Sequence, residues 1–313
     1  MNTIVTVTLN TSIDRLIEVG NFHVGGHLKG RLLRRVPAGK GVNVSRALSS
    51  LGVASIATGF VGCEELDQYD RSFDGQRVQP QFLAVRGITR ENITLIDPQA
   101  HNETHIRDTG IVPSETDLER LRRKIDLLAK PGAHVIFSGS LPPGVENDYA
   151  VELVDITIRA GARVIIDAPG DFLRAVRTRD IDLLKPNVQE LGEMHETDSL
   201  SDDRIVTLGR ALSESIRVVM VTCGSAGGYL FVNDSAFLGQ VDVAPELIRS
   251  TVGCGDAMLA AFVTAQIRGD NPVDSYRFAL AVASAAATHE IPGTFESNIA
   301  EQMLALTSVE PVS

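Results

Sequence analysis

The sequence has little of several residue types, and each scarcity excludes a class of protein. Tryptophan is absent and aromatic residues make up 5% of the 313 residues, so a core must consist of valine, isoleucine, leucine and alanine. The three cysteines, Cys63, Cys223 and Cys254, are far apart and form no C-x-x-C pair. This spacing matches neither a disulfide framework nor a zinc site.

Long apolar runs and an excess of positive charge are also missing. The apolar run at 4–9 is too short for a signal-sequence core or a membrane-spanning helix. The net charge is −11 at pH 7, which argues against general binding to nucleic acid or anionic membranes. We therefore expect a cytoplasmic protein with no nucleic-acid or membrane partner, in which local basic residues attract any anionic ligand.

The residues that are present alternate between strand and helix patterns. Short apolar runs rich in β-branched residues lie at 4–9, 55–60, 134–140, 163–169, 181–187 and 217–224. Helical patterns separate several of them, at 43–52, 115–130, 146–161 and 202–216. This alternation is typical of βαβ units in a parallel sheet with helices on both faces. A hairpin and three helices are expected to follow, with only the last few residues loose.

Two regions depart from this alternation. Residues about 13–37 and about 82–110 contain short strand-like pieces without a helical pattern. We expect them to form a small accessory sheet beside the α/β core, within a single domain that spans residues 1–313.

A turn bracketed by glycines precedes an apolar helix in STVGCGDAML, residues 250–259. Gly253 and Gly255 permit positive φ, so successive N–H groups can point into one concavity. The unpaired N–H groups at the start of the helix favour phosphate oxygens. Asp256 could then accept the proton of a hydroxyl group that attacks the phosphoryl group. The alternative is that Asp256 is only an N-cap and the glycines only a turn.

A second glycine-rich turn, within 37–52, also leads into a helix. Gly39 and Gly41 let a ligand approach the backbone, and Asn43 offers a donor and an acceptor to sugar hydroxyls. Neither the P-loop spacing nor G-x-G-x-x-G is present. A plain N-capped helix would explain the same letters.

Two further sets of polar residues give weaker signals. Asn187 and Glu190, three apart at the start of a helix, could orient a hydrated Mg²⁺ near ATP phosphates. A helix cap with an acidic third residue explains that pair better when it is considered alone. The basic residues of the irregular regions could select an anionic substrate, and Arg90, just before a predicted strand, is the strongest candidate. This basic set is Lys29, Arg31, Arg34, Arg35, Arg90 and Arg107.

Seven motifs follow one another over nearly the whole chain: TLNTSIDR, AGKGVNVSRALSSLG, GITREN, SGSLPPG, KPNVQE, TCGSAGG and STVGCGDAM. Their order resembles the PfkB (ribokinase-like) family of carbohydrate kinases. Within it the sequence is most similar to the branch of 1-phosphofructokinase, tagatose-6-phosphate kinase and the minor 6-phosphofructokinase. The resemblance implies a three-layer α/β/α core with a mostly parallel sheet, a small β-sheet lid over the sugar site, and ATP and Mg²⁺ as cofactors.

The resemblance also implies a role for each matching residue. The catalytic base is Asp256, and the anion hole for the transferring phosphoryl group is Gly253, Cys254 and Gly255. The sugar positions are Asp14, Gly39, Lys40 and Asn43, with Arg90 on the substrate's own phosphate. The nucleotide positions are Asn187, Thr222, Gly224 and Gly227, and Glu190 organises Mg²⁺ mainly through water. A homodimer through the lid is implied as well, since an open lid would leave apolar strand edges exposed.

The implied reaction is ATP-dependent phosphorylation of a hydroxymethyl group of a ketohexose phosphate. Fructose 1-phosphate is the first choice, because Lys40 between two glycines resembles the 1-phosphofructokinase and tagatose-6-phosphate kinase types. Tagatose 6-phosphate and fructose 6-phosphate are alternatives, whereas an unphosphorylated acceptor would leave Arg90 without a partner. A catalytically silent sugar-phosphate sensor is disfavoured by the intact Asp256 turn, and a dinucleotide oxidoreductase by the missing G-x-G-x-x-G.

Several residues depart from the family's pattern. Cys254 stands where alanine is usual, Ala257 where the branch usually has serine, and Thr11 where it commonly has proline. Residues 103–110 and 59–70 also differ, near the predicted sugar site, so the resemblance implies the reaction more firmly than the substrate. The Cys254 thiol beside the anion hole predicts an activity that is sensitive to oxidation or alkylation.

Overall fold

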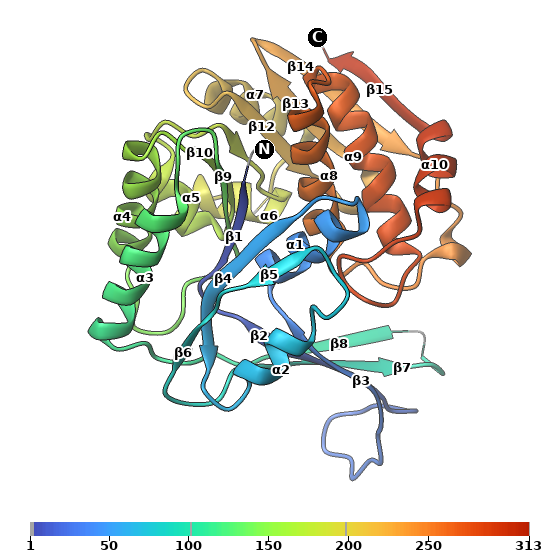
Figure 1. Cartoon of the computed structure of the whole chain (residues 1–313). Coiled ribbons are helices and arrows are strands. Elements are labelled where there is room, and N and C mark those ends of the chain that lie inside the picture. Colours follow the sequence, from blue (N-terminus) through green and yellow to red (C-terminus); the bar gives the residue numbers. More distant parts are fainter. Residues whose placement is uncertain (1–2, 101, 198, 313) are drawn as a thin grey trace.

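Short runs of aliphatic, β-branched residues form the strands of a large sheet in the computed structural model, which describes residues 3–100, 102–197 and 199–312 (Figure 1). The strand order is β15-β14-β13-β12-β11-β10-β9-β1-β4-β5, and β6 also pairs with β4. The bounds are β1 Ile4–Thr8, β4 Ser55–Gly62, β5 Val78–Pro80, β6 Leu83–Val85, β9 His134–Ser138, β10 Arg163–Asp167, β11 Leu183–Leu184, β12 Val218–Thr222, β13 Gly228–Val232, β14 Ser235–Val241 and β15 Thr307–Val312.

The sheet is parallel from β12 across to β5 and antiparallel from β12 to β15. All five residues of β1 are buried, as expected for a central strand that has helices over both faces. This arrangement confirms the predicted α/β class with a mostly parallel sheet.

Helices cover both faces of the sheet and create two separate cores. One face carries α1 (Lys40–Ser50), α8 (Cys254–Arg268), α9 (Pro272–Ala287) and α10 (Ser297–Ala305). The other carries α3 (Glu115–Leu128), α4 (Asn147–Arg159), α5 (Gly170–Val176), α6 (Val188–Met194) and α7 (Asp202–Ser213). Short elements complete the chain: α2 (Leu66–Arg71) and the 3-10 turns η1 (Gly224–Ala226) and η2 (Pro245–Leu247).

A second, four-stranded sheet, called here the small sheet, has the order β3-β2-β7-β8. Its strands are β2 (Ser12–Glu18), β3 (Arg31–Ala38), β7 (Glu91–Asp97) and β8 (Asn102–Arg107). Figure 1 shows it projecting from the edge of the large sheet at which β1 ends. A third hydrophobic cluster, which includes Ile13, Tyr69 and Phe82, lies at its base.

Three sequence expectations need correction. Leu83 and Val85, expected in the accessory sheet, are buried in the main core because β6 pairs with β4. Residues 307–312, near the end expected to be loose, form β15 and pair with β14 along six residue pairs, whereas residue 313 lies outside the described residues. The strand expected at 181–187 is only two residues long, and it ends before Pro186, which has no N–H to donate to a sheet.

The direction in which the chain builds the sheet reverses at β1 and β9. The chain leaves β1 toward β4 through α1 on one face, and reaches β9 and β10 through α3 and α4 on the other. A reversal of this kind separates the following loops and leaves room for a ligand. No described helix has the length and apolar character needed to cross a bilayer.

Candidate active site

The turn before α8 presents free N–H groups. Gly253 is the N-cap with φ of 83°, and no side chain caps the helix. A Cβ at this position would lie 2.8 Å from the amide nitrogen of Gly293, so the left-handed turn and the tight packing both require glycine. Asp256 is the third helical residue, so the alternative in which it serves as the N-cap is wrong. The uncapped N–H groups of Gly253, Cys254 and Gly255 form a ready site for phosphate oxygens.

Asp256 is buried between α8 and α1, with 5% of its surface exposed. The side-chain amide nitrogen of Asn43 donates to its Oδ2 at 2.9 Å. Burial and the Asp167 carboxylate raise the pKa of Asp256 to about 7, while Lys40, Asn43 and Lys185 act in the opposite direction. A carboxyl group with a pKa near neutrality is suited to accept a proton at physiological pH.

A group of charged side chains acts on this carboxylate, of which Asp167 and Lys185 are buried and Lys40 is partly exposed. The Nζ of Lys40 lies 2.9 Å from Oδ1 of Asp167 and 2.9 Å from Oε1 of Glu190. The Nζ of Lys185 lies 3.2 Å from Oδ2 of Asp167. Burial alone would raise the pKa of Asp167, but Lys185 and Lys40 hold it below its usual value. Asp167 therefore remains ionised and pairs with two ammonium groups, of which that of Lys185 lies against the α8 turn.

Asp167 and Lys185 were missed in the sequence analysis. Each follows the apolar run of a strand, Asp167 at the end of β10 and Lys185 directly after β11. A Cβ on Gly255 would lie 3.2 Å from the Nζ of Lys185, which places this ammonium group against the glycine turn. The available signal was a charged residue at the carboxyl end of a predicted parallel strand.

Asn187 and Glu190 form a reciprocal helix cap on α6. The Glu190 amide donates to Oδ1 of Asn187 at 2.8 Å, and the Asn187 amide donates to Oε2 of Glu190 at 2.9 Å. The two residues therefore do form the helix cap with an acidic third residue that was the alternative explanation of this pair. The second oxygen of Glu190 still faces Lys40. The pair thus links the α6 cap to the buried charges.

The predicted nucleotide residues lie at the carboxyl end of β12. Thr222 ends the strand and pairs with Asn187 through an isolated bridge. Gly224 and Gly227 have φ of 61° and 93°, and a Cβ on Gly227 would lie 2.1 Å from the carbonyl oxygen of Gly239. Close packing on β14 explains Gly227 without a ligand. In the order of the large sheet, β12 lies on the opposite side of β10 and β11 from β1, so these residues lie away from the end of β1, where the small sheet begins.

The predicted sugar residues divide between two elements. Asp14, on β2 of the small sheet, accepts hydrogen bonds from Ser12 Oγ at 2.9 Å and Asn92 Nδ2 at 3.0 Å. Gly39 has φ of 136° directly before Lys40, and a Cβ there would lie 2.7 Å from Cγ2 of Thr8. The turn is therefore held close to the end of β1.

Arg90 lies at the base of the small sheet, where β7 begins. It donates to the main-chain carbonyls of Asn10 at 3.0 Å, Thr11 at 3.3 Å and Asp108 at 3.3 Å. Burial lowers its pKa, although Asp14 opposes this effect. A guanidinium group has five N–H donors, so some stay available after three carbonyl contacts.

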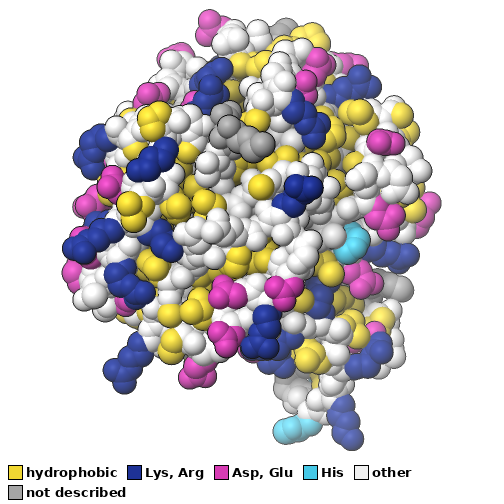
Figure 2. All heavy atoms as spheres, viewed as in Figure 1, with side chains coloured by type: hydrophobic (Ala, Val, Ile, Leu, Met, Phe, Trp, Pro, Cys, Tyr) yellow, Lys and Arg dark blue, Asp and Glu magenta, His cyan; other side chains and the backbone are white. Residues whose placement is uncertain are grey.

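The other basic residues of the irregular regions are mostly engaged elsewhere or exposed. Arg31 pairs with Glu18 at 3.1 Å and Arg35 with Glu91 at 3.3 Å, both within the small sheet. Arg34 donates to the main-chain carbonyl of Glu290. On the face shown in Figure 2, basic and acidic side chains are interspersed, so an anion would be attracted by local groups.

Direct contacts bring part of the predicted site together. These contacts form two groups, Asn43 with Asp256, and Lys40 with Asp167, Glu190 and Lys185. The charges of Asp167, Lys40 and Lys185 act on Asp256 across the space between the two groups. Asp14 and Arg90 bind other groups at the base of the small sheet, and no direct contact joins either of them to Asp256 in the described part of the chain.

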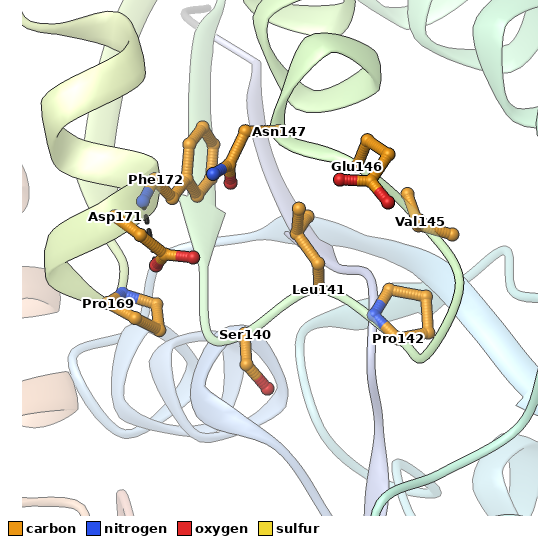
Figure 3. A pocket seen from close by; sticks show the side chains of 9 residues that line it. All are labelled: Ser140, Leu141, Pro142, Val145, Glu146, Asn147, Pro169, Asp171 and Phe172. Carbon is orange, nitrogen blue, oxygen red and sulfur yellow. Dashed lines mark hydrogen bonds between the residues drawn. The ribbon is translucent and has the colours of Figure 1, made fainter.

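A cavity of about 310 Å³ lies between the loops that follow β9 and β10 (Figure 3). Its lining consists of Ser140, Leu141, Pro142, Val145, Glu146, Asn147, Pro169, Asp171 and Phe172. None of the predicted site residues is among them, and the two carboxylates would repel a phosphate group. The cavity therefore lies apart from the residues around Asp256.

The structure argues against a reactive thiol at Cys254, contrary to the expectation from sequence. Burial and the nearby Asp256 raise the pKa of Cys254 to about 12. Since the thiolate is the nucleophile, alkylation at neutral pH should be slow. We expect iodoacetamide at pH 7.5 to modify the exposed Cys63 well before Cys254, with activity retained, as measured by peptide mass spectrometry. Equal labelling of both thiols, or protection of activity by Cys254→Ala, would contradict this.

Known proteins resemble the chain over most of its length. The sequence model for "pfkB family carbohydrate kinase" matches residues 4–298. The 1-phosphofructokinase of Bacillus subtilis (strain 168) is 33% identical over 295 residues, 94% of this chain and 95% of that protein. The tagatose-6-phosphate kinase of Staphylococcus epidermidis is 28% identical over 271 residues, 84% and 85% of the two chains. The structure of phosphofructokinase-2 from Escherichia coli in complex with fructose-6-phosphate matches with a TM-score of 0.88 and 23% identity, covering 97% of this chain and 99% of that one.

Proposed function

The chain belongs to the pfkB family of carbohydrate kinases, which are ATP-dependent phosphotransferases, and we propose that it phosphorylates a hydroxymethyl group of a ketohexose phosphate. Fructose 1-phosphate is the proposed substrate and fructose 1,6-bisphosphate the product. The observation that carries the proposal is the buried Asp256 carboxyl, with a pKa of about 7, beside an uncapped helix start and two ammonium groups.

In the proposed reaction, Asp256 accepts the proton of the attacking hydroxymethyl group. The Asn43 amide fixes one carboxylate oxygen, which leaves the other to face the acceptor. The raised pKa brings the base close to the operating pH, where general-base catalysis is most effective. No covalent enzyme intermediate is required.

Charge on the transferring phosphoryl group is met by groups that are already in position. The N–H groups of Gly253 to Gly255 and the ammonium group of Lys185 lie at the same turn. Lys40, held by Asp167 and Glu190, adds a second ammonium group. Fixed donors of this kind need no reorganisation during the reaction, which is why they lower the barrier.

The proposed cofactor Mg²⁺ would be held mainly through water. Within residues 3–100, 102–197 and 199–312, no group of three His, Cys, Asp or Glu side chains is arranged to bind a metal directly. Glu190 already uses one oxygen in the α6 cap and the other on Lys40, so a hydrated ion fits better than direct ligation. Mg²⁺ keeps several waters readily and would neutralise ATP phosphates. Thr222, Gly224 and Gly227 are proposed to lie beside the nucleotide.

On the sugar side, Asp14, Gly39 and Asn43 are proposed to bind hydroxyl groups. Arg90 would contact the phosphate that the substrate already carries, using N–H groups not engaged by main-chain carbonyls. Small-sheet closure over the sugar would bring Asp14 and Arg90 toward Asp256. Under this proposal the small sheet is the lid of the single domain.

We further propose a homodimer that is formed through the small sheets. Among the described residues, no strand pairs with the outer edges of β3 and β8, and Leu32, Leu33 and Ile106 are 49%, 42% and 51% exposed. Apolar residues and open strand edges at one surface favour pairing with another copy.

Two substrate alternatives remain in the same class, tagatose 6-phosphate and fructose 6-phosphate. The dinucleotide oxidoreductase is wrong, because the chain belongs to a kinase family. A silent sensor is disfavoured by the intact network around Asp256.

The deciding experiment measures ADP release with MgATP and a panel of acceptors: fructose 1-phosphate, fructose 6-phosphate, tagatose 6-phosphate, ribose and a nucleoside. Turnover dominated by fructose 1-phosphate supports the proposal. Turnover only with an unphosphorylated acceptor removes the role given to Arg90. Binding of a sugar phosphate without turnover of any acceptor would indicate the sensor.

The pH dependence of the reaction should follow Asp256. The base works only when deprotonated, so a pKa of about 7 means that activity falls as the pH drops below that value. An aspartate with an ordinary pKa would stay active far below it. We expect kcat/KM for the sugar phosphate, measured from pH 5.5 to 9, to fall about tenfold per pH unit on the acid side. A flat profile down to pH 5.5 would contradict this assignment.

A further inference from the structure

Arg46, on α1, is an arginine buried without a carboxylate partner. It is 6% exposed, and no carboxylate lies within ion-pair distance of it in the part of the chain that the structure describes. A buried guanidinium group is costly unless other atoms satisfy it. Its few contacts therefore indicate why the chain keeps an arginine at this position.

Three contacts surround the guanidinium group of Arg46. Its Nη2 donates to the carbonyl of Pro37 at 2.7 Å, and its Nη1 donates to Oδ1 of Asn43 at 3.4 Å. Its Cζ lies 5.6 Å from the centre of the Phe73 ring. Arg46 therefore touches the last turn of the chain before Gly39 and, one helical turn away on α1, the side chain that contacts Asp256.

The contact with Asn43 determines which end of its amide faces the base. A guanidinium group has donors only, so it selects the oxygen of the amide. The amide nitrogen is then turned to Oδ2 of Asp256, where the distance is 2.9 Å. If the amide were flipped, its nitrogen would face the N–H donors of Arg46 and its oxygen would face the carboxylate oxygen of Asp256. Both contacts would then be repulsive.

We infer that Arg46 is a positioning residue for phosphoryl transfer, which acts by fixing the Asn43 amide so that it donates to the catalytic base. The inference rests on the proposed role of Asp256. It adds a residue to that site with no direct contact to substrate or base.

Several other groups influence the pKa of Asp256 directly, and their influence has to be distinguished from that of Arg46. They are Lys40 and Asn43 from α1, Asp167 at the end of β10, Lys185 after β11, and Cys254 on α8 itself. Within the described residues, no hydrogen bond or ion pair joins Arg46 to Asp256, and the chain of contacts between them runs through Asn43. A direct charge effect of Arg46 would survive the loss of Asn43, whereas an effect through Asn43 would not.

A double-mutant cycle with Arg46→Met and Asn43→Leu tests the inference. We expect Arg46→Met to lower kcat/KM about tenfold and to move the acid side of the pH profile up by about one unit, since the ionised base loses a donor. The same shift is expected in Asn43→Leu. The double variant should be no worse than Asn43→Leu alone, because the two residues act in series. KM for ATP should stay near the wild-type value.

Arg210→Met is the matched control. Like Arg46, Arg210 makes two hydrogen bonds and no ion pair in the described part of the chain, here with the main-chain carbonyls of Asp234 and Val312, far from the site. It should leave the pH profile unchanged. If Arg46→Met does not fold, Arg46→Lys replaces it, because lysine cannot reach Pro37 and Asn43 together.

Additive effects in the cycle, or an unchanged pH profile in the Arg46 variant, would overturn the inference. The substrate assignment can fail separately, since the cycle runs with any acceptor that the kinase phosphorylates.

Discussion

Replacing Asp256 with asparagine should lower kcat by about 10³-fold, within the range that a general base contributes. Asparagine keeps the shape of the side chain but cannot accept the hydroxyl proton. It also removes the repulsion between the carboxylates of Asp256 and Asp167, so the fold should remain intact. The measurement is the rate of ADP release with saturating MgATP and sugar phosphate, together with calorimetric binding of the sugar phosphate.

Asp270→Asn provides the control for that experiment. Asp270 is exposed, just beyond the far end of α8, and its side chain has no hydrogen-bond partner among the described residues. Its variant should keep wild-type kcat. If Asp256→Asn retained more than about a tenth of wild-type kcat, Asp256 would not be the base.

Replacing Lys40 with methionine should lower kcat by about 10²-fold or more, the typical effect of removing one fixed charge-stabilising donor. Methionine fills similar space without the ammonium group that pairs with Asp167 and Glu190. A second effect is expected on the pH profile. Because Lys40 lowers the pKa of Asp256, its loss should move the acid side of the profile to higher pH.

Lys124→Met is the control for this experiment, because it removes a lysine that lies away from the proposed site. Lys124 is a half-buried lysine on α3 whose Nζ donates to the carbonyl of Gln81 at 3.0 Å, away from the site. We expect wild-type activity and an unchanged profile. A Lys40→Met variant with normal kcat but a raised KM would limit Lys40 to substrate binding.

The sequence predicted where the strands and helices lie better than it predicted which strands are neighbours in the sheet. Periodicity located the strands at 4–9 and 134–140, and the glycine turn at Gly253 located the start of α8. Strand order lies outside such patterns, because it depends on which apolar faces pack together. Leu83 and Val85 read as part of an accessory sheet, yet their side chains complete the main core.

The same limit applies to the candidate site. Asp256 stands in a turn with its own local signature, whereas Asp167 and Lys185 are single charged residues after ordinary strands. They become site residues only because β10 and β11 are neighbours and α1 brings Lys40 across to them. Arg46 is still harder to predict as a site residue, because an arginine in an amphipathic helix is usually on the solvent face.

The order of strands in the large sheet also governs how the chain assembles as it is synthesised. From β9 to β15, each strand lies beside the one made just before it, so this half of the sheet extends at a single growing edge. β1 is different, since its second partner, β9, begins at His134. A nascent chain that ends before this point holds the future centre of the sheet with one side unpaired. We therefore expect the chain up to His134 to need protection during synthesis and the last strands to join a nearly complete body.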